Sequence, residues 1–265
     1  EYNPYVAKSP TPLNGTADVA TTQSTISWAA GDYAVEHDIY FGTDHDAVAN
    51  ADTASSEYKG RQTATSWTLP QLDFGQTYYW RIDEINDDSS VTTGNVWNFT
   101  TSEFRLVEDF ESYADSTALN NAWSTTSATL NLQNTGGFAN TKGMEVSYFA
   151  DVGDAKIWKN ISPALNIANT GVESISMQVF GNQSNAPQAM YLALEDGTNR
   201  LRVDAVDPNL SEEYWMEYNF DLQPFRDAGL DMTNIIKLEI GLPQSGNIGT
   251  VKVDNIRLYP ARCLM

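Results

Sequence analysis

Cysteine and histidine are nearly absent from this chain of 265 residues. The single cysteine, Cys263, lies close to the C-terminus, so no disulfide and no cysteine-based zinc site can form within the chain. The only histidines are His37 and His45. Everything after residue 45 therefore lacks the residue needed for a histidine-dependent triad or a histidine general base. Catalysis in that part of the chain would have to depend on aspartate or glutamate.

Positive charge is also scarce. The chain has 15 Lys and Arg against 35 Asp and Glu, which gives a formal net charge of −20. Binding to nucleic acid phosphates or anionic lipid needs clustered basic side chains, so the charge disfavours both, and it counts mildly against highly sulfated glycans. No apolar run is long enough to span a bilayer, and no signal peptide is recognisable. We predict no nucleic-acid partner and no membrane insertion.

Aromatic side chains, by contrast, are plentiful. They make up 11% of the chain, with 13 Tyr, 7 Trp and 10 Phe, and hydrophobic residues reach 41%. This composition is typical of strands rather than helices and is sufficient for a sizeable core. The richness in Asn, Thr, Ser and Tyr, together with few lysines, favours a secreted protein, either extracellular or at the cell surface.

Residues 1–102 contain short segments in which apolar and polar residues alternate with period two, separated by turn signals. Such a pattern in about a hundred residues predicts a small β-sandwich. Trp28, Tyr40, Trp80 and Trp97 fall where its core would lie. The predicted strands lie within residues 24–31, 36–44, 65–72, 76–86 and 96–101.

Two motifs at the end of this region carry a resemblance. "LDFGQTYYWRIDEIN" (residues 72–86) and "GNVWNFTT" (residues 94–101) resemble the last strands of a fibronectin type III-like domain. The variant is one common in secreted multidomain proteins of planctomycetes and related bacteria. The resemblance implies a spacer or presentation module without chemistry of its own. It also implies a corner hydrogen bond from Tyr78 or Tyr79.

Residues 103–265 also alternate in short segments, and the helix signals are weak. At most one or two helical turns are expected over residues 222–229. We predict a second, larger β-sandwich of the jelly-roll type. The predicted strands lie within residues 174–182, 189–197, 200–206, 213–222, 235–243 and 251–259.

The two ends of this second region carry the more specific resemblance. "RLVEDFESY" (residues 105–113) and "VKVDNIRLYPARC" (residues 251–263) resemble a jelly-roll domain of planctomycete secreted proteins, which is similar to galactose-binding-like and carbohydrate-binding-module sandwiches. The resemblance implies an all-β chain with two domains, 1–102 and 103–265, forming part of a larger multidomain protein. Because this fold serves many roles, the resemblance says little about the ligand.

The opening acids of "VEDFESY" allow three interpretations. Asp109 and Glu111, two positions apart on an expected strand, would share a face and could form a glycosidase pair. Alternatively, related sandwiches hold a structural Ca²⁺ between the first and last strands. By motif, that implies Glu111 and Asp254, with Asp109 less certain, completed by main-chain carbonyls. The third interpretation is that the acids are solvated or paired with basic neighbours, and we expect Glu108 to be only solvated. We favour Ca²⁺.

Sugar recognition needs aromatic faces and polar groups that read hydroxyls. Strand alternation places several such side chains on the polar side of the middle strands. If these strands share a sheet, its outer face forms a sugar-binding platform. The aromatic residue Trp158, flanked by two lysines, is a further candidate for sugar binding. Packing within the protein is the alternative role for each aromatic ring. The candidate ligand-binding residues are Tyr191, Arg202, Trp215, Gln178 and Trp158.

These patterns together predict a non-catalytic module that binds polysaccharide and targets an attached enzyme or the cell surface to it. Two other functions stay open. The chain could be a structural or adhesive spacer that binds protein, or a polysaccharide-degrading enzyme with Asp or Glu catalysts on the concave face.

Overall fold

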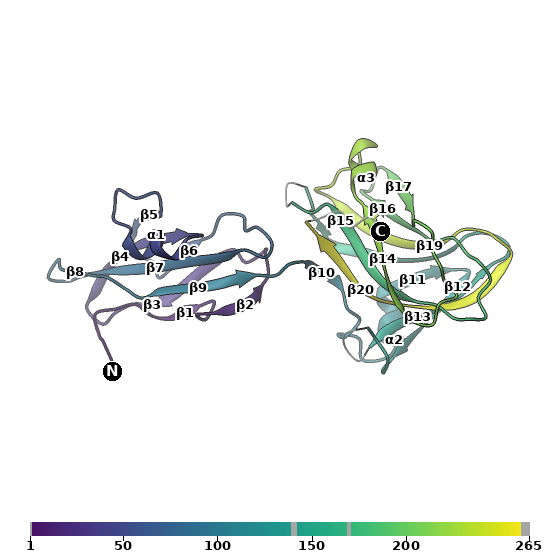
Figure 1. Ribbon diagram of the computed structural model, residues 1–265, viewed down its shortest axis with the longest axis horizontal. Coiled ribbons are helices and arrows are strands. Elements are labelled where there is room, and N and C mark those ends of the chain that lie inside the picture. The colour runs from purple at the N-terminus through teal and green to yellow at the C-terminus, as the bar shows by residue number, and fades with distance from the viewer. Residues whose placement is uncertain (1, 139–141, 169–170, 261–265) are drawn as a thin grey trace. The chain divides into compact units, whose positions relative to one another are not determined.

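The computed structural model describes residues 2–138, 142–168 and 171–260. The chain forms two compact units, Glu1–Glu103 and Phe104–Met265 (Figure 1). Strands make up about half of it and build several sheets, so the predicted all-β class is confirmed. Among the described residues, no helix is long and apolar enough to cross a membrane.

The first unit is a β-sandwich of a three-stranded and a six-stranded sheet. Its single helix, α1 (His45–Asn50), begins at Asp44, whose carboxylate accepts a hydrogen bond from the amide of Ala47. The small sheet has the order β1-β3-β6, that is Lys8–Thr11, Thr25–Ala29 and Ser66–Thr68. The large sheet has the order β2-β9-β7-β4-β5 with β8 beside β7, that is Thr16–Val19, Val96–Thr101, Thr77–Asn86, Ala34–Gly42, Tyr58–Gln62 and Val91–Thr92.

The four aromatic residues that the sequence assigned to the core of this unit are buried. Trp28, Trp80 and Trp97 lie in one core cluster between the sheets. Tyr40 is also buried, but on the other side of the large sheet, where the guanidinium of Arg81 lies 4.2 Å above its ring.

A tyrosine corner closes the end of the large sheet. The hydroxyl of Tyr78 accepts a hydrogen bond of 2.9 Å from the amide of Asp73, five residues upstream. Tyr78 is buried, whereas Tyr79 faces the exposed ring of His45. Of the two candidates for a corner bond, the structure therefore selects Tyr78.

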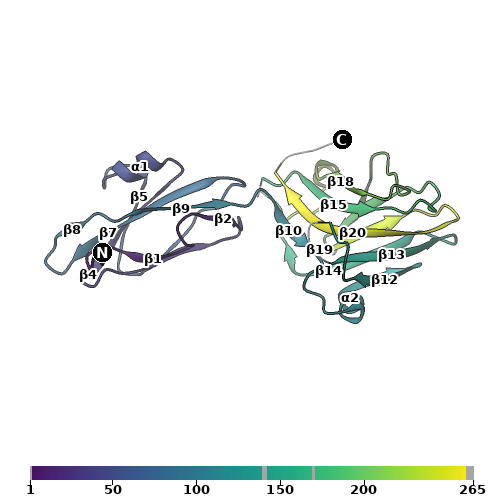
Figure 2. The same ribbon diagram turned by 60° about the horizontal axis from the view of Figure 1, so that its bottom comes forward.

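The second unit is a larger β-sandwich, and its described residues include two short helices, α2 (Ser116–Ala122) and α3 (Gln223–Asp227). In one sheet the long strand β20 lies between β13 and β15 (Figure 2). This six-stranded sheet has the order β12-β13-β20-β15-β18 with β10 beside β20, that is Ala128–Gln133, Gly143–Ala150, Asn247–Tyr259, Ser174–Phe180, Trp215–Asp221 and Arg105–Glu108. The five-stranded sheet has the order β11-β14-β19-β16-β17, that is Trp123–Thr126, Ala155–Leu165, Ile235–Leu242, Tyr191–Glu195 and Arg200–Asp204.

The chain leaves strand β10 directly after Glu108. Phe110 is fully buried and adopts a φ of 60°, a left-handed conformation that is uncommon for a large side chain and breaks a strand. The expectation that Asp109 and Glu111 share one face of a strand is therefore wrong. The first and last strands of this unit do lie side by side, since Glu108 of β10 lies opposite Ile256 of β20.

Asp196 fixes the turn between β16 and β17. One of its oxygens accepts hydrogen bonds from the amides of Thr198 and Asn199, at 2.7 and 2.6 Å, and the other accepts one from the amide of Asp231 at 2.9 Å. These amides, with that of Asp231 contributing most, hold the pKa of the Asp196 carboxyl well below its usual range. The residue thus joins the β16–β17 turn to the loop before β19.

We expect Asp196→Asn to lower the melting temperature by several degrees at about pH 7 and by less at about pH 2.5. A carboxyl whose pKa is lower in the folded chain adds stability above its unfolded value of 3.8. That stability is lost as the pH falls through the folded value. Calorimetry of both proteins at about pH 7 and pH 2.5 tests this. An equal difference at both pH values would contradict the role of the charge.

Candidate functional site

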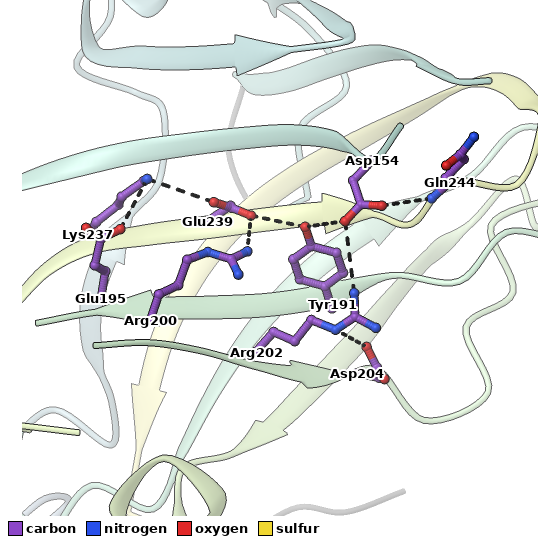
Figure 3. A network of polar contacts seen from close by, with 9 residues as sticks. All are labelled: Asp154, Tyr191, Glu195, Arg200, Arg202, Asp204, Lys237, Glu239 and Gln244. Atoms are coloured by element: carbon purple, nitrogen blue, oxygen red, sulfur yellow. Dashed lines mark hydrogen bonds and ion pairs between the residues drawn. The ribbon is translucent and has the colours of Figure 1, made fainter. Parts of the chain in front are cut away.

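One face of the five-stranded sheet gathers charged side chains around a tyrosine. Leu192 and Leu194 of β16, and Met190 directly before it, point into the core, so Tyr191 and Glu195 project to the opposite side. The register brings residues of β19 and β17 beside them, because Tyr191 pairs with Gly241 and Asp204, and Glu195 pairs with Lys237 and Arg200. We call this surface the five-strand face (Figure 3). Its residues are Asp154, Lys156, Trp158, Tyr191, Glu195, Arg200, Arg202, Asp204, Lys237 and Glu239.

Tyr191 lies flat at the centre of this face. Its ring occupies the space above Gly241, where an added Cβ would lie only 1.9 Å from the ring carbon Cζ. Its hydroxyl lies 3.1 Å from Glu239 Oε1 and 3.2 Å from Asp154 Oδ2. Burial, together with the Glu239 carboxylate, raises the pKa of the Tyr191 hydroxyl, so this group stays a neutral donor. Tyr191 thereby links two acids from different segments.

Two guanidinium groups lie over this centre and remain open to solvent. Arg200 Nη2 donates to Glu239 Oε1 at 2.5 Å, a bond that raises the pKa of Arg200 further. The guanidinium of Arg202 lies 4.8 Å above the Tyr191 ring. Its nitrogens are 3.4 Å from Asp204 and 4.0 Å from Asp154, and 44% of its side chain is exposed. Arg202 is therefore the loosely held cation of the face.

Opposite charges on the five-strand face are equal in number. Each of its four carboxylates lies within 4.0 Å of an Arg or Lys nitrogen, and the Lys237 ammonium also lies 5.1 Å above the ring of Trp158. The face is thus close to neutral on a chain whose net charge is −20. It offers fixed hydrogen-bond donors and acceptors side by side.

The five predicted ligand-binding residues do not lie together. Tyr191, Arg202 and Trp158 share the five-strand face, but Gln178 and Trp215 lie on β15 and β18 of the other sheet. The expectation that these strands share one sheet is wrong, because alternation shows which side of a strand is polar but not which strands pair. The expectation that the Tyr191 ring is exposed and can stack on a sugar is also wrong. The ring is fully buried between Gly241 and Arg202.

Gln178 and Trp215 belong to an aromatic surface on the six-stranded sheet. Trp215 meets the rings of Phe138 and Phe180 at centroid distances of 6.0 and 5.6 Å, both nearly edge-on. Gln178 Nε2 donates a hydrogen bond of 2.9 Å to Glu217 Oε2. We call these five residues, Phe138, Gln178, Phe180, Trp215 and Glu217, the six-strand cluster.

The three predicted metal-binding acids lie near the junction of β10 and β20. Asp254 is fully buried, and its carboxylate accepts hydrogen bonds of 2.7 Å from the amides of Phe138 and Asn255. Burial, with the charges of Glu111 and Asp109 adding to it, raises the pKa of Asp254 to about 6. The structure thus brings the three acids into electrostatic contact.

The surroundings of these acids are rich in oxygen. A Cβ at Gly137 would lie 2.1 Å from the carbonyl oxygen of Lys142 and 2.9 Å from Asp254 Oδ2, so the loop holds a carbonyl and a carboxylate close together. Glu111 Oε1 accepts a bond from the amide of Lys142, while Lys142 Nζ donates to the carbonyls of Glu111 and Tyr113. Carboxylate and carbonyl oxygens are the donors that Ca²⁺ prefers.

Side chains alone do not form a metal centre. Within the described part of the chain, no group of three or more His, Cys, Asp or Glu side chains is placed to hold a metal ion. A Ca²⁺ bound by Glu111, Asp109 and Asp254 would therefore need main-chain carbonyls as well. These residues fit a hard cation in chemistry, and the metal site stays a prediction.

Of the ten residues of the five-strand face, the sequence analysis selected only Tyr191, Arg202 and Trp158. Among those that it missed, Asp154, Arg200 and Glu239 contact Tyr191 or one another. The segment "IIKLEIGLP" places Lys237 and Glu239 on its polar side, and this alternation could have identified both. Asp154 lies in the loop before β14, where the sequence carries no such signal.

No protein-family model matches the sequence, and no curated protein matches it. Some solved structures are similar in fold. The family 11 carbohydrate-binding module of the cellulosomal cellulase Lic26A-Cel5E of Clostridium thermocellum is 17% identical, with a TM-score of 0.43, over 60% of this chain and 95% of that chain. An exo-β-agarase is 14% identical, with a TM-score of 0.47, over 59% of this chain and 25% of that chain. A chain from work on β-sandwich carbohydrate-binding modules is 12% identical, with a TM-score of 0.39, over 96% of this chain and 98% of that chain. Similarities at this distance transfer neither a ligand nor an activity.

Proposed function

We propose that this chain is a non-catalytic glycan-binding protein that holds a polysaccharide on the five-strand face. The observation that carries the proposal is the network around Tyr191, over which the exposed guanidinium of Arg202 lies beside Asp154 and Asp204. Sugar hydroxyls donate and accept hydrogen bonds at once, so they suit a surface with both kinds of group. Because Tyr191 holds Glu239 and Asp154 in place before binding, little conformational entropy is lost at these two groups on contact.

The pairing of the acids favours binding over hydrolysis. A glycosidase needs one carboxyl that stays protonated to serve as a general acid. On the five-strand face, Glu239 is bonded to Arg200 and Glu195 lies 3.2 Å from Lys237. Both carboxylates are thus occupied by basic side chains, and Glu239 is buried, so neither is placed to reach a glycosidic oxygen. The face is thus better suited to recognition than to acid catalysis.

The wider organisation follows the sequence resemblance. We propose that the second unit is a jelly roll of the carbohydrate-binding-module type and that the first is a fibronectin III-like spacer, in a secreted multidomain protein. The tyrosine corner at Tyr78 supports a fibronectin III-like first unit, since such corners recur in sandwiches of this kind. An adhesive spacer that binds protein is the competing function, and a glycan screen separates the two.

The direct test is affinity electrophoresis of the full chain in gels that contain neutral glucan, xylan, mannan or agarose. We expect retardation by at least one of them, and Arg202→Ala should weaken it about tenfold, or about 1.4 kcal/mol, by removing the loosely held donor. The matched control is Arg226→Ala, because Arg226 is also an ion-paired arginine but bonds to Glu173 and the carbonyl of Val172. Retardation by no polysaccharide would favour the spacer, and released oligosaccharides would show an enzyme.

We also propose a structural Ca²⁺ held by Glu111, Asp254 and Asp109 together with main-chain carbonyls. Binding would tie β10 to β20 and offset the repulsion among the acids. At a Ca²⁺ concentration about 100 times Kd, one bound ion adds about 2.7 kcal/mol, or about 5–10 °C in melting temperature. Calorimetry with EDTA and then with excess Ca²⁺ measures this shift, and Asp254→Asn should remove it. An unchanged melting temperature after EDTA treatment would contradict the site.

A further inference from the structure

The six-strand cluster is an aromatic surface that the five-strand face cannot use, because the two lie on different sheets. We propose that it is a second glycan-binding site, which takes a neutral pyranose unit against Trp215. The inference rests on the proposed function in one respect, that the ligand is a polysaccharide. It adds a separate site of different chemistry, in which an aromatic ring rather than a guanidinium makes the main contact.

Trp215 is held in place while remaining partly exposed. The rings of Phe138 and Phe180 meet it at interplanar angles of 71° and 65°, and edge-to-face contacts of this kind fix the orientation of a ring. Phe138 is itself anchored, since its amide donates to Asp254. A tryptophan fixed before binding gives a sugar ring apolar contact at low entropic cost.

A polar group lies at the right spacing for the hydroxyls of the same sugar. Glu217 is two residues beyond Trp215 in β18, so both project from the same side of the sheet, about 6–7 Å apart along the strand. A sugar ring stacked on Trp215 could therefore direct a hydroxyl towards Glu217. Gln178 Nε2 bonds Oε2 of Glu217, which fixes the carboxylate and adds an amide carbonyl beside it.

The strand that carries Trp215 is accessible from the side. β18 ends the order of the six-stranded sheet, and a depression runs along it, lined by residues 214–219 together with Val206 and Asp207. Tyr214 is 56% exposed and Val206 is 60% exposed. A chain of sugars could therefore extend past Trp215 along the edge of the sandwich.

The composition of this edge favours a neutral sugar over a peptide or an acidic glycan. An exposed charge such as Glu217 on an edge strand hinders pairing with another polypeptide strand. Asp207 and Glu217 in the lining, on a chain of net charge −20, repel uronic acids and sulfate esters. Lys252 lies 5.1 Å from the centre of the Phe180 ring and adds a single basic group.

Two tryptophans report the two sites separately, because Trp158 lies on the five-strand face and Trp215 in the six-strand cluster. The test is to titrate the full chain with neutral hexasaccharides of glucose, xylose, mannose and agarose type, and to follow the indole N–H signals by NMR. The variants Trp158→Phe and Trp215→Phe assign the two signals. We expect both signals to move, and the Trp215 signal to move with the same Kd in Arg202→Ala.

A second variant keeps the aromatic packing intact. Glu217→Ala should weaken the Trp215 titration at least fivefold and leave the Trp158 titration unchanged. On insoluble polysaccharide it should also reduce retention about tenfold or more, because two linked sites bind more tightly than one. Normal retention and an unchanged Trp215 titration would overturn the second site.

The outcomes separate the two proposals. If only Trp158 responds, the five-strand face binds glycan and the second site is wrong. If only Trp215 responds, the second site stands and the five-strand face is wrong. If the Trp215 response disappears in Arg202→Ala, it was transmitted from the first site, which overturns the second. If neither responds to any sugar, both proposals fail.

Discussion

Replacing Gly241 with alanine is expected to lower glycan affinity at the five-strand face by at least tenfold. The added Cβ would lie 1.9 Å from Tyr191 Cζ and 2.3 Å from its hydroxyl oxygen, so the ring would have to leave its place. Tyr191 links Glu239 to Asp154 and supports Arg202, and all three would lose their positions. A tenfold loss corresponds to about 1.4 kcal/mol, which is modest for the disruption of a whole network.

The matched control for this variant is Gly153→Ala, because a Cβ at Gly153 meets no atom within 4 Å. Affinity electrophoresis and calorimetry of both variants separate binding from stability. Tyr191→Phe keeps the ring and removes only the hydroxyl, so its loss of affinity should be smaller than that of Gly241→Ala. Wild-type affinity in Gly241→Ala would show that the Tyr191 network does not position the binding groups.

The strands of this protein could be predicted from local alternation, but their partners could not. The period-two pattern located β15, β16, β17, β18, β19 and most of β20. It could do so because a strand with one buried side alternates apolar and polar residues along its own sequence. Which strands lie side by side depends on contacts far apart in sequence. β15 pairs with β20, and β16 pairs with β19, and nothing in the local pattern distinguishes these pairs. Helix α2, seven residues long, is too short to show a period.

The same limit explains the outcome at the candidate sites. Alternation correctly placed Tyr191 on the side of β16 away from the core. Its burial depends on Gly241 opposite and Arg202 above, neither of which is near it in sequence. Trp215 and Gln178 were likewise assigned to the correct side of their strands. They belong to another surface because β15 and β18 lie in the other sheet.

Glu108, at the start of the second unit, shows that an acidic residue in a strand need not be exposed to solvent. Glu108 was expected to be only solvated, yet its side chain is 5% exposed. It accepts hydrogen bonds from the hydroxyl of Tyr113 at 2.8 Å and from the amide of Phe110 at 2.9 Å, and Lys159 also donates to it. Strands disfavour acids in general, but a buried acid with this many donors is satisfied. The sequence around Glu108 gives no sign of Lys159, 51 residues away.

Glu108→Ala is expected to destabilise the second unit by about 3–5 kcal/mol, the cost of breaking a buried ion pair from one side. Burial by itself would lower the pKa of Lys159, but its bonds to Glu108 and Tyr113 outweigh burial and raise it. Without Glu108, the ammonium would stay half-buried with only the Tyr113 hydroxyl as a partner among the bonds described. Hydrogen exchange read by mass spectrometry on the full chain measures the opening free energy of β15 and β20, separately from the first unit.

Two comparisons make the result specific to the buried pair. Glu173→Ala removes a carboxylate that meets Arg226 at 3.3 Å with 36% of its side chain exposed, and exposed pairs of this kind contribute about 0–1 kcal/mol. Glu108→Leu combined with Lys159→Met replaces both charges by apolar groups and should recover most of the loss, because no buried charge is left unpaired. A loss below about 1 kcal/mol in Glu108→Ala would show that water reaches Lys159. In that case the Glu108–Lys159 pair would not hold β10 to β14, and β10 would depend on its pairing with β20.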